Sequence, residues 1–276
     1  MPPPTDDLRF TPEVRAMLGA LVSGVRAALG DDLVGVYLRG SLALGDFDPE
    51  SSDLDFLVVT GPPVSDAQFA ALADLHTRLA ALDNPYAGHI EGSYIDRASL
   101  RHFAPHERRH PTVGPDWAFS RGEHGADWML ERWVVRERGV TLLGPDPRTL
   151  IEPITADGLR VSVRQTLRSW ASQPDEPEWL RRRSYQAFAV QTMCRALFTL
   201  LTGELPSKPR AVAWALGALP GPWRSLIERS RAWHLDDTPD PSALPEVMRF
   251  VRWAASEGEA AVVGETTPGP RPPDSG

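Results

Sequence analysis

The period of the hydrophobic pattern changes near residue 150, and this change limits the possible folds more than any other feature of the sequence. Before it, apolar segments at 33–38, 53–59 and 90–95 resemble buried strands, and helical patterns occupy 12–29, 66–82 and 127–138. After it, only helical spacing recurs, at 158–172, 178–201, 211–219, 223–233 and 244–263. The sequence therefore predicts an α+β fold, with a small mixed sheet in an N-terminal domain and an all-helical C-terminal domain.

Proline and glycine mark where these domains meet. Two prolines and a glycine fall within 144–147, and Pro153 follows shortly after. Such residues oppose continuous secondary structure. We therefore predict a first domain over 1–150 and a helical domain over 151–263. The remaining residues, 264–276, are mostly Pro, Gly and small polar residues, which predicts a disordered tail.

The composition is that of an ordinary globular protein, with 42% hydrophobic and 24% charged residues among 276. Cys194 is the single cysteine and lies within an apolar helical pattern, so we expect a buried structural thiol and no disulfide within the chain. The first residues lack a basic segment followed by an apolar stretch, and no apolar run approaches ~18 residues. We expect a cytoplasmic protein without a membrane partner, as a monomer or weak dimer.

Charge is unevenly distributed along the chain. The net charge is −8, but residues 31–100 contain 12 Asp/Glu and 3 Lys/Arg, whereas residues 158–210 contain 4 Asp/Glu and 9 Lys/Arg. An acidic region can hold divalent metal and a basic region can hold phosphate, although two solvated surfaces without a shared role would give the same counts. A nucleic-acid partner is not expected, because duplex-binding proteins are usually basic overall.

The segment 37–59 carries most of the chemical information. One predicted strand runs into Gly40 and Ser41, and a second opens with Asp53 and Asp55. Side chains alternate along a strand, so both aspartates should point to one face. Two carboxylates held this close repel each other unless a cation neutralises them, and hard oxygen ligands suit Mg²⁺. Each element alone would be an ordinary turn or strand start, but together they predict a metal site.

The glycine and the serines of this segment are suited to phosphate. Gly40 permits close backbone approach, and the hydroxyl and N–H of Ser41 can bind a phosphate oxygen. We predict nucleotide contacts at Gly40, Ser41 and Ser52. Eleven residues separate Ser41 from Asp53. A Gly-Ser pair followed at this distance by Asp-x-Asp, between two strands, resembles the signature of the DNA polymerase β-like nucleotidyltransferases.

That resemblance implies a third carboxylate from a later strand. Glu91, near the start of the 90–95 segment, is the candidate, since it follows Asp55 with one predicted helix between them. A charged residue early in a strand can also simply face solvent, and Asp96 is the alternative if the register differs. The predicted catalytic residues and metal ligands are therefore Asp53, Asp55 and Glu91, with two Mg²⁺ ions.

The helical half extends the resemblance. Residues 193–215 resemble the helical domain of the aminoglycoside (3″)(9) adenylyltransferases, which adenylylate streptomycin and spectinomycin. Together with the strand motif, the resemblance covers residues 33 to about 235. It implies that Arg195 and Lys208 contact the phosphates of ATP and that Trp233 lies near the nucleotide. Taken alone, the first two would be ordinary surface charges and the tryptophan an ordinary core residue.

The resemblance also implies a reaction. AMP would pass from ATP to a hydroxyl of a small-molecule acceptor such as an aminoglycoside antibiotic, in a Mg²⁺-dependent in-line attack on the α-phosphorus. Glu91 would accept the hydroxyl proton, while Ser41, Arg195 and Lys208 would neutralise charge on the leaving pyrophosphate. Two alternatives stay open: an antitoxin-type enzyme that AMPylates another protein, and a noncatalytic nucleotide-binding regulator.

One segment departs from the resemblance. Members that act on aminoglycosides use acidic residues at the start of the helix that carries the phosphate-binding arginine, where they meet the ammonium groups of the drug. Here that stretch contains three arginines at 181–183, followed by Tyr185. Either the acceptor is neutral or anionic, or its amines meet other acids, such as Glu123, Asp127 or Glu131.

A second motif competes with this interpretation. His106 to His110 match the His-Glu-x-x-His pattern of zinc proteases, in which two histidines one helical turn apart bind the metal. Pro111 and Pro105 flank the motif and leave room for about one helical turn, so we do not expect zinc. His102, His106 and His110 are instead expected to form a polar connector that can contact the acceptor.

Overall fold

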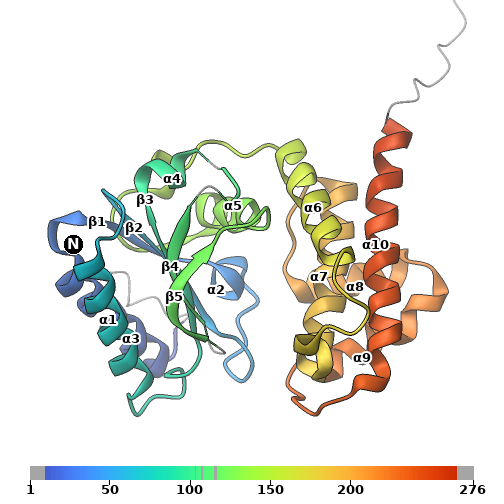
Figure 1. Cartoon of the computed structure of the whole chain (residues 1–276), viewed down its shortest axis with the longest axis horizontal. Coiled ribbons are helices and arrows are strands. Elements are labelled where there is room, and N and C mark those ends of the chain that lie inside the picture. Colours follow the sequence, from blue (N-terminus) through green and yellow to red (C-terminus); the bar gives the residue numbers. More distant parts are fainter. Residues whose placement is uncertain (1–9, 103, 107, 115–116, 266–276) are drawn as a thin grey trace, which may run out of the picture. The chain divides into compact units, whose positions relative to one another are not determined.

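The computed structural model describes residues 10–102, 104–106, 108–114 and 117–265. The chain forms two compact units, which divide between Thr155 and Ala156, a few residues after the predicted boundary. The first unit contains the sheet with its helices, and the second is helical (Figure 1). A mixed N-terminal sheet followed by a helical region is the α+β architecture that the sequence predicts.

The described residues form one six-stranded sheet, in the order β5-β4-β3-β2-β1-β6. β2 and β3 pair in parallel, whereas the other neighbours pair antiparallel. The parallel pair is connected through helix α3 (Asp66–Ala80), because parallel strands need a crossover. The strands are β1 (Leu33–Leu38), β2 (Leu54–Thr60), β3 (Ile90–Asp96), β4 (Arg109–Gly114), β5 (Trp117–Glu123) and β6 (Val140–Leu143).

The hydrophobic pattern does not predict β4, β5 or β6. β6 has only four residues, and β5 is an edge strand with charged residues. β4 contains Pro111, which pairs with Arg121 of β5 but cannot donate a hydrogen bond to the ladder. Short or polar strands lack the continuous apolar run that identifies β1, β2 and β3.

N-capping side chains set the helix starts in the first unit. α1 (Pro12–Leu29) begins after Thr11, whose hydroxyl accepts a hydrogen bond from the Val14 N–H at 3.3 Å. α3 begins after Ser65, which forms a capping box with Gln68. These side chains satisfy N–H groups that have no partner within the helix. Other described α-helices of this unit are α2 (Gly40–Leu44), α4 (Arg97–Arg101) and α5 (Trp128–Arg138).

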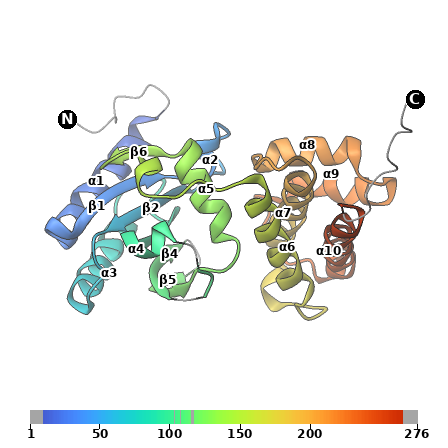
Figure 2. The ribbon, with the colours of Figure 1, turned by 90° about the horizontal axis from the view of Figure 1, so that it is seen from above.

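Helices cover both faces of the sheet. α1 and α3 lie on one side and α5 on the other (Figure 2). Along β2, Phe56 belongs to the core that contains α1 and α3, whereas Leu57 and Val59 pack with Val135 of α5. Because side chains alternate along a strand, Asp55 lies on the same face as Leu57, the face covered by α5.

α7 (Arg183–Thr202) is the central helix of the second unit. It packs against α6 (Ala156–Ala171), α8 (Lys208–Ala218), α9 (Arg224–Trp233) and α10 (Leu244–Glu265). Cys194 of α7 is fully buried, and burial raises the pKa of its thiol to about 12. Cys194 is thus the buried structural thiol that the sequence predicts.

Several element ends differ from the prediction by a few residues, among them the start of α8 at Lys208. Residues 178–181 form a separate 3₁₀ turn before α7, and α10 continues through Glu265, into the segment predicted to be disordered. The rest of that segment, 266–276, lies outside the described residues. Within the described residues, every helix is too short or too polar to cross a membrane.

Candidate active site

The turn after β1 brings the backbone against a carboxylate. Gly40 has a φ of 59°, a left-handed conformation that favours glycine. A Cβ atom at this position would overlap the carboxylate of Asp55. A larger residue would therefore displace either the turn or Asp55. The close backbone approach predicted at Gly40 is therefore an approach to Asp55, on the strand that is predicted to bind metal.

Asp55 and Glu91 lie side by side on the sheet. They are register partners in the parallel β2–β3 pair, so their side chains point to the same face. Asp53 immediately precedes β2, and its charge acts on Asp55. The alternative candidate, Asp96, instead caps α4, because its Oδ1 accepts a hydrogen bond from the Ser99 N–H at 3.0 Å.

The guanidinium of Arg39 connects three carboxylates. Its Nη1 lies 2.9 Å from Oε2 of Glu131 and 3.4 Å from Oδ1 of Asp55, and its Nη2 lies 3.0 Å from Oε1 of Glu91. Arg39 is only 6% exposed, and its backbone N–H donates to the Asp55 carbonyl at 3.0 Å. Arg39 is not among the site residues predicted from the sequence, although its position next to Gly40 was an available signal.

Burial is the main influence on Asp55 and raises the pKa of its carboxyl well above the usual range. The guanidinium of Arg39 opposes this rise, while the carboxylates of Glu91, Glu131 and Asp53 add to it. One guanidinium against four carboxylates leaves the site with an excess of negative charge. Such a site attracts a divalent cation.

The donor chemistry fits Mg²⁺. Asp53 is partly exposed, with its Oδ1 3.0 Å from Nδ1 of His89, and Asp55 supplies a second carboxylate two residues later. No three His, Cys, Asp or Glu side chains of the described residues form a metal cage by themselves. Protein-bound Mg²⁺ usually needs only one or two carboxylates, together with substrate phosphates and water. Asp53 and Asp55 meet that requirement.

The two predicted serines have different surroundings. Ser41 lies in α2, and its hydroxyl has no hydrogen-bond partner among the described residues. The hydroxyl of Ser52 accepts a hydrogen bond from the Asp48 N–H at 3.0 Å, and the Ser52 N–H donates to the Asp48 carbonyl at 2.8 Å. Ser52 therefore stabilises the loop before Asp53, whereas the Ser41 hydroxyl can bind a ligand.

The remaining predicted nucleotide contacts belong to the second unit. Arg195 is half-buried on α7 and forms no ion pair with the residues that the structure describes. Lys208 is the first residue of α8, and its Nζ lies 4.4 Å from the ring centroid of Phe188. Trp233 ends α9, is 9% exposed and has two arginine guanidinium groups over its ring.

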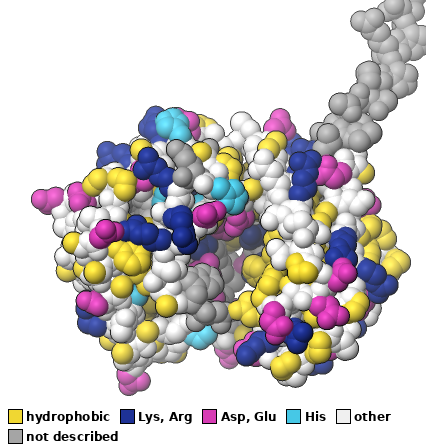
Figure 3. Space-filling view, viewed as in Figure 1, with side chains coloured by type: hydrophobic (Ala, Val, Ile, Leu, Met, Phe, Trp, Pro, Cys, Tyr) yellow, Lys and Arg dark blue, Asp and Glu magenta, His cyan; other side chains and the backbone are white. Residues whose placement is uncertain are grey.

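The three arginines near the start of α7 each pair with an acid. Their partners cannot be seen in the local sequence, because the loop after α9 supplies most of the carboxylates. On the face drawn in Figure 3, basic and acidic side chains are likewise interspersed on both units. The pairs are Arg181–Glu178 at 2.9 Å, Arg182–Asp237 at 3.6 Å, Arg183–Asp236 at 2.9 Å and Arg183–Asp240 at 3.1 Å.

The described residues of the His106–His110 motif are not helical, and Glu107, the glutamate of the motif, lies outside the described residues. His106 lies in a turn with a φ of 62°, and its Nδ1 is 3.0 Å from Oε2 of Glu123. His110 is buried in β4, with its ring centroid 4.3 Å from that of His124. The motif therefore lacks the helical spacing of a zinc protease. The prediction that these histidines form a polar connector is also wrong for His110, because His110 lies within a paired strand. His102, by contrast, is exposed.

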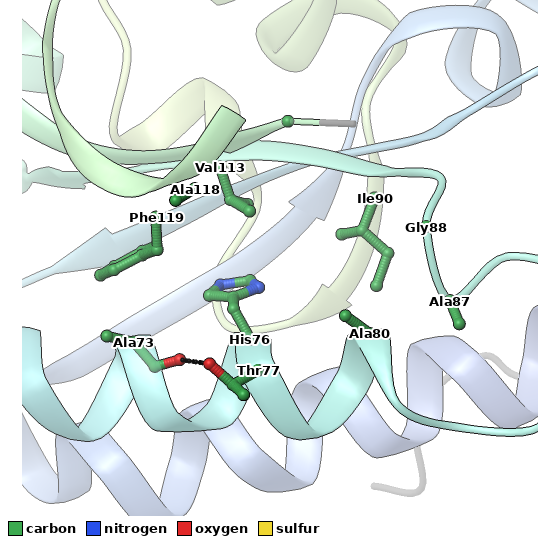
Figure 4. Close-up of a pocket in the computed structure, with 11 residues that line it drawn as sticks. Ala73, His76, Thr77, Ala80, Ala87, Gly88, Ile90, Val113, Ala118 and Phe119 are labelled. Atoms are coloured by element: carbon green, nitrogen blue, oxygen red, sulfur yellow. Dashed lines mark hydrogen bonds between the residues drawn. The ribbon is translucent and has the colours of Figure 1, made fainter. Parts of the chain in front are cut away.

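A cavity of about 530 Å³ lies between α3 and the β4–β5 hairpin (Figure 4). Alanines and other apolar residues line most of it. Its polar lining residues are already bonded: the Thr77 hydroxyl donates to the Ala73 carbonyl at 3.0 Å, and Nε2 of His76 lies 2.7 Å from the Tyr94 hydroxyl. Its described lining includes no charged side chain, so it does not suit a triphosphate.

His76 should make the first unit sensitive to acid. Burial lowers its pKa from 6.5 to about 4, so between these values the unfolded chain binds a proton that the native state excludes. Stability should be lost as the pH falls from about 6.5 through about 4, by about 3 kcal/mol from this group. Urea unfolding measured across that pH range should show that the free energy of unfolding falls less steeply with decreasing pH for His76→Phe than for the wild type. Equal slopes would contradict the assignment.

Two known protein families match separate parts of this chain. The family described as nucleotidyltransferase domain matches residues 22–91, a range that contains Gly40, Ser41, Asp53, Asp55 and Glu91. The family described as aminoglycoside adenylyltransferase, C-terminal domain, matches residues 149–257, a range that contains Arg195, Lys208 and Trp233.

Individual relatives cover nearly the whole chain. The aminoglycoside (3'') (9) adenylyltransferase of Escherichia coli is 24% identical over 257 residues, or 89% of this chain and 95% of that protein. The spectinomycin 9-adenylyltransferase of Campylobacter jejuni is 22% identical over 261 residues, or 90% of this chain and 96% of that protein. The crystal structure of spectinomycin adenyltransferase AAD(9) from Enterococcus faecialis, with ATP and spectinomycin, shares the fold. Its TM-score is 0.70 at 16% identity, and the match covers 87% of this chain and 98% of that one.

The family matches and the relatives give the class of protein: the chain is a nucleotidyltransferase. Within that class, it joins a nucleotidyltransferase domain to an aminoglycoside adenylyltransferase C-terminal domain. It resembles the aminoglycoside (3'') (9) and spectinomycin adenylyltransferases over most of its length.

Proposed function

We propose that this enzyme transfers AMP from ATP to a hydroxyl group of an aminoglycoside or of spectinomycin. The observation that carries the proposal is the pairing of Asp55 with Glu91 on one sheet face, against the Gly40 turn. The names of the relatives support the acceptor class, since they are adenylyltransferases of these antibiotics.

The chain's own residues can be given roles in that reaction. Two magnesium ions held by Asp53 and Asp55, with Glu91 as a further ligand of the second, would neutralise charge that develops on the phosphates. Glu91 would accept the proton of the attacking hydroxyl, since it stands beside Asp55. The Ser41 hydroxyl would donate a hydrogen bond to a phosphate oxygen. The acceptor oxygen forms a bond to the α-phosphorus while the bond to pyrophosphate breaks, without a covalent enzyme intermediate.

The paired arginines at 181–183 remove the main electrostatic objection to a cationic acceptor. With Glu178, Asp236, Asp237 and Asp240 as partners, three positive charges face four negative ones. An ammonium group brought near this segment would not meet an uncompensated cluster of guanidinium groups. We therefore propose that this segment tolerates a cationic drug, so the acceptor need not be neutral or anionic.

A panel of acceptors tests the proposed function. The enzyme is incubated with Mg²⁺, α-labelled ATP and, in separate reactions, streptomycin, other aminoglycosides, spectinomycin, nucleosides and candidate proteins. We expect label on streptomycin, spectinomycin or both, and none on the nucleosides. Label on a protein alone would instead identify a protein-AMPylating enzyme, and the absence of any label would indicate a noncatalytic nucleotide-binding protein.

Arg195 and Lys208 are proposed to contact the β and γ phosphates. Arg195→Ala and Lys208→Ala should each weaken ATP binding by about tenfold or more but leave AMP binding within about threefold, because AMP lacks those phosphates. Calorimetric titration with both nucleotides measures the difference. Arg210→Ala is the matched control, since Arg210 is an exposed residue of α8 that pairs with Glu204. An equal loss for ATP and AMP would show that these residues do not contact the terminal phosphates.

A further inference from the structure

The surroundings of Arg39 indicate a role beyond the carboxylates that it contacts. Its two terminal nitrogens contact Asp55, Glu91 and Glu131, and its guanidinium lies 5.5 Å from the ring centroid of Trp128. Its Nε is buried and has no hydrogen-bond partner among the described residues. Burying a charge with one donor unsatisfied is unfavourable for folding. Buried donors that lack a hydrogen-bond partner occur mainly at functional sites.

The backbone explains why this side chain stays at the site. Arg39 follows directly after β1 and precedes Gly40, and its N–H is hydrogen-bonded to the carbonyl of Asp55. Glu131 comes from α5, the helix that covers this face of the sheet. Arg39 is therefore held to the sheet through its backbone and to α5 through its guanidinium group.

We propose that Arg39 is a positioning residue that holds Asp55 and Glu91 in place and sets how strongly their site attracts a divalent cation, while Glu131 holds Arg39. This inference rests on the proposed function, because it assumes that Asp53 and Asp55 bind the metal. One guanidinium cannot neutralise all the carboxylates, so the site still attracts a cation. The guanidinium does offset part of the charge of the carboxylates, and Glu131 in turn offsets part of the charge of Arg39.

Two substitutions that break the same ion pair should therefore have opposite effects on metal affinity. Arg39→Met removes the positive charge and should tighten Mn²⁺ binding by about tenfold. Glu131→Gln leaves Arg39 less neutralised and should weaken Mn²⁺ binding by about tenfold. The double variant should return the affinity to within about threefold of the wild type. A residue that only stabilised the fold would shift both single variants in the same direction.

Arg39→Lys separates charge from geometry. A lysine retains the positive charge but not the planar fork that reaches two carboxylates at once. We expect Mn²⁺ affinity within about threefold of the wild type but kcat lower by about tenfold or more, because Glu91 is no longer fixed beside Asp55. Arg121→Met is the matched control, since Arg121 forms an ion pair with the exposed Asp66 at 3.1 Å. It should change neither value.

The experiment is Mn²⁺ titration of the full chain without nucleotide, followed by electron paramagnetic resonance, with thermal midpoints recorded for each variant. Opposite shifts for Arg39→Met and Glu131→Gln would support the inference. If Asp55→Asn abolishes Mn²⁺ binding but these variants shift affinity together or not at all, the role of Arg39 is wrong and the metal site stands. If Mn²⁺ binding does not depend on Asp55, the proposed metal site itself is wrong, and the inference fails with it. If Arg39→Met does not fold, Glu131→Gln and Arg39→Lys still provide the test.

Discussion

Asp55→Asn and Asp53→Asn should each reduce pyrophosphate release by about a thousandfold or more, because the proposed metal site loses a carboxylate in each. Both should also abolish Mg²⁺-dependent ATP binding. The thermal midpoint should stay nearly unchanged or rise, since the half-buried Asp55 lies beside other carboxylates, including Asp53, and an amide relieves that repulsion. Arg39 would still contact Glu91 and Glu131 in the Asp55 variant.

Pyrophosphate release and thermal unfolding, measured on the same preparations, check both parts of this expectation. Asp66→Asn is the control, because Asp66 is an exposed aspartate in the first turn of α3. It should keep the wild-type rate. A wild-type rate in either Asp53→Asn or Asp55→Asn would contradict the metal assignment. A large drop in the midpoint would show that the carboxylates serve mainly the fold.

Gly40→Ala should reduce activity by about a hundredfold or more, because the added Cβ atom would overlap the Asp55 carboxylate. Moving that carboxylate by about 1 Å is enough to misalign the reacting groups. The substitution also places alanine at a φ of 59°, which costs about 1–2 kcal/mol of stability. Steady-state kinetics and chemical unfolding separate these two effects.

Gly45 provides a matched control for that prediction. Gly45 follows directly after α2, the short helix that begins at Gly40, and has a φ of 82°. A Cβ atom at Gly45 would meet nothing within 4 Å. Gly45→Ala should therefore lose a similar amount of stability and retain activity within about threefold of the wild type. Comparable losses of activity in both variants would mean that backbone strain, rather than contact with Asp55, explains the effect at Gly40.

The sequence was sufficient for elements with strong local signals. The helix capped by Thr11 and the three apolar strands are found where the periodicity predicts them. The register pairs Asp55 directly with Glu91, whereas Asp96, the alternative candidate, caps α4. By contrast, β4 was missed, since Pro111 and His110 offer no apolar run, and only pairing with β3 and β5 makes this segment a strand.

Contacts between distant segments could not be predicted from one sequence. Glu131 approaches Arg39 only because α5 packs on the face that carries Asp55, and Asp236 approaches Arg183 only because the loop after α9 returns to the start of α7. No local pattern encodes either pair. The partners of Arg39 and Arg183 are therefore known only from the structure.

The most direct test of the proposed reaction compares two labels on ATP. The enzyme is incubated with Mg²⁺ and an acceptor antibiotic, with ATP labelled at either the α or the γ phosphorus, and the products are separated. We predict that the α label moves to the antibiotic and that the γ label appears in pyrophosphate, with both signals lost in Asp55→Asn. Transfer of the γ label to the antibiotic, or α-label transfer that persists in Asp55→Asn, would contradict the proposed reaction.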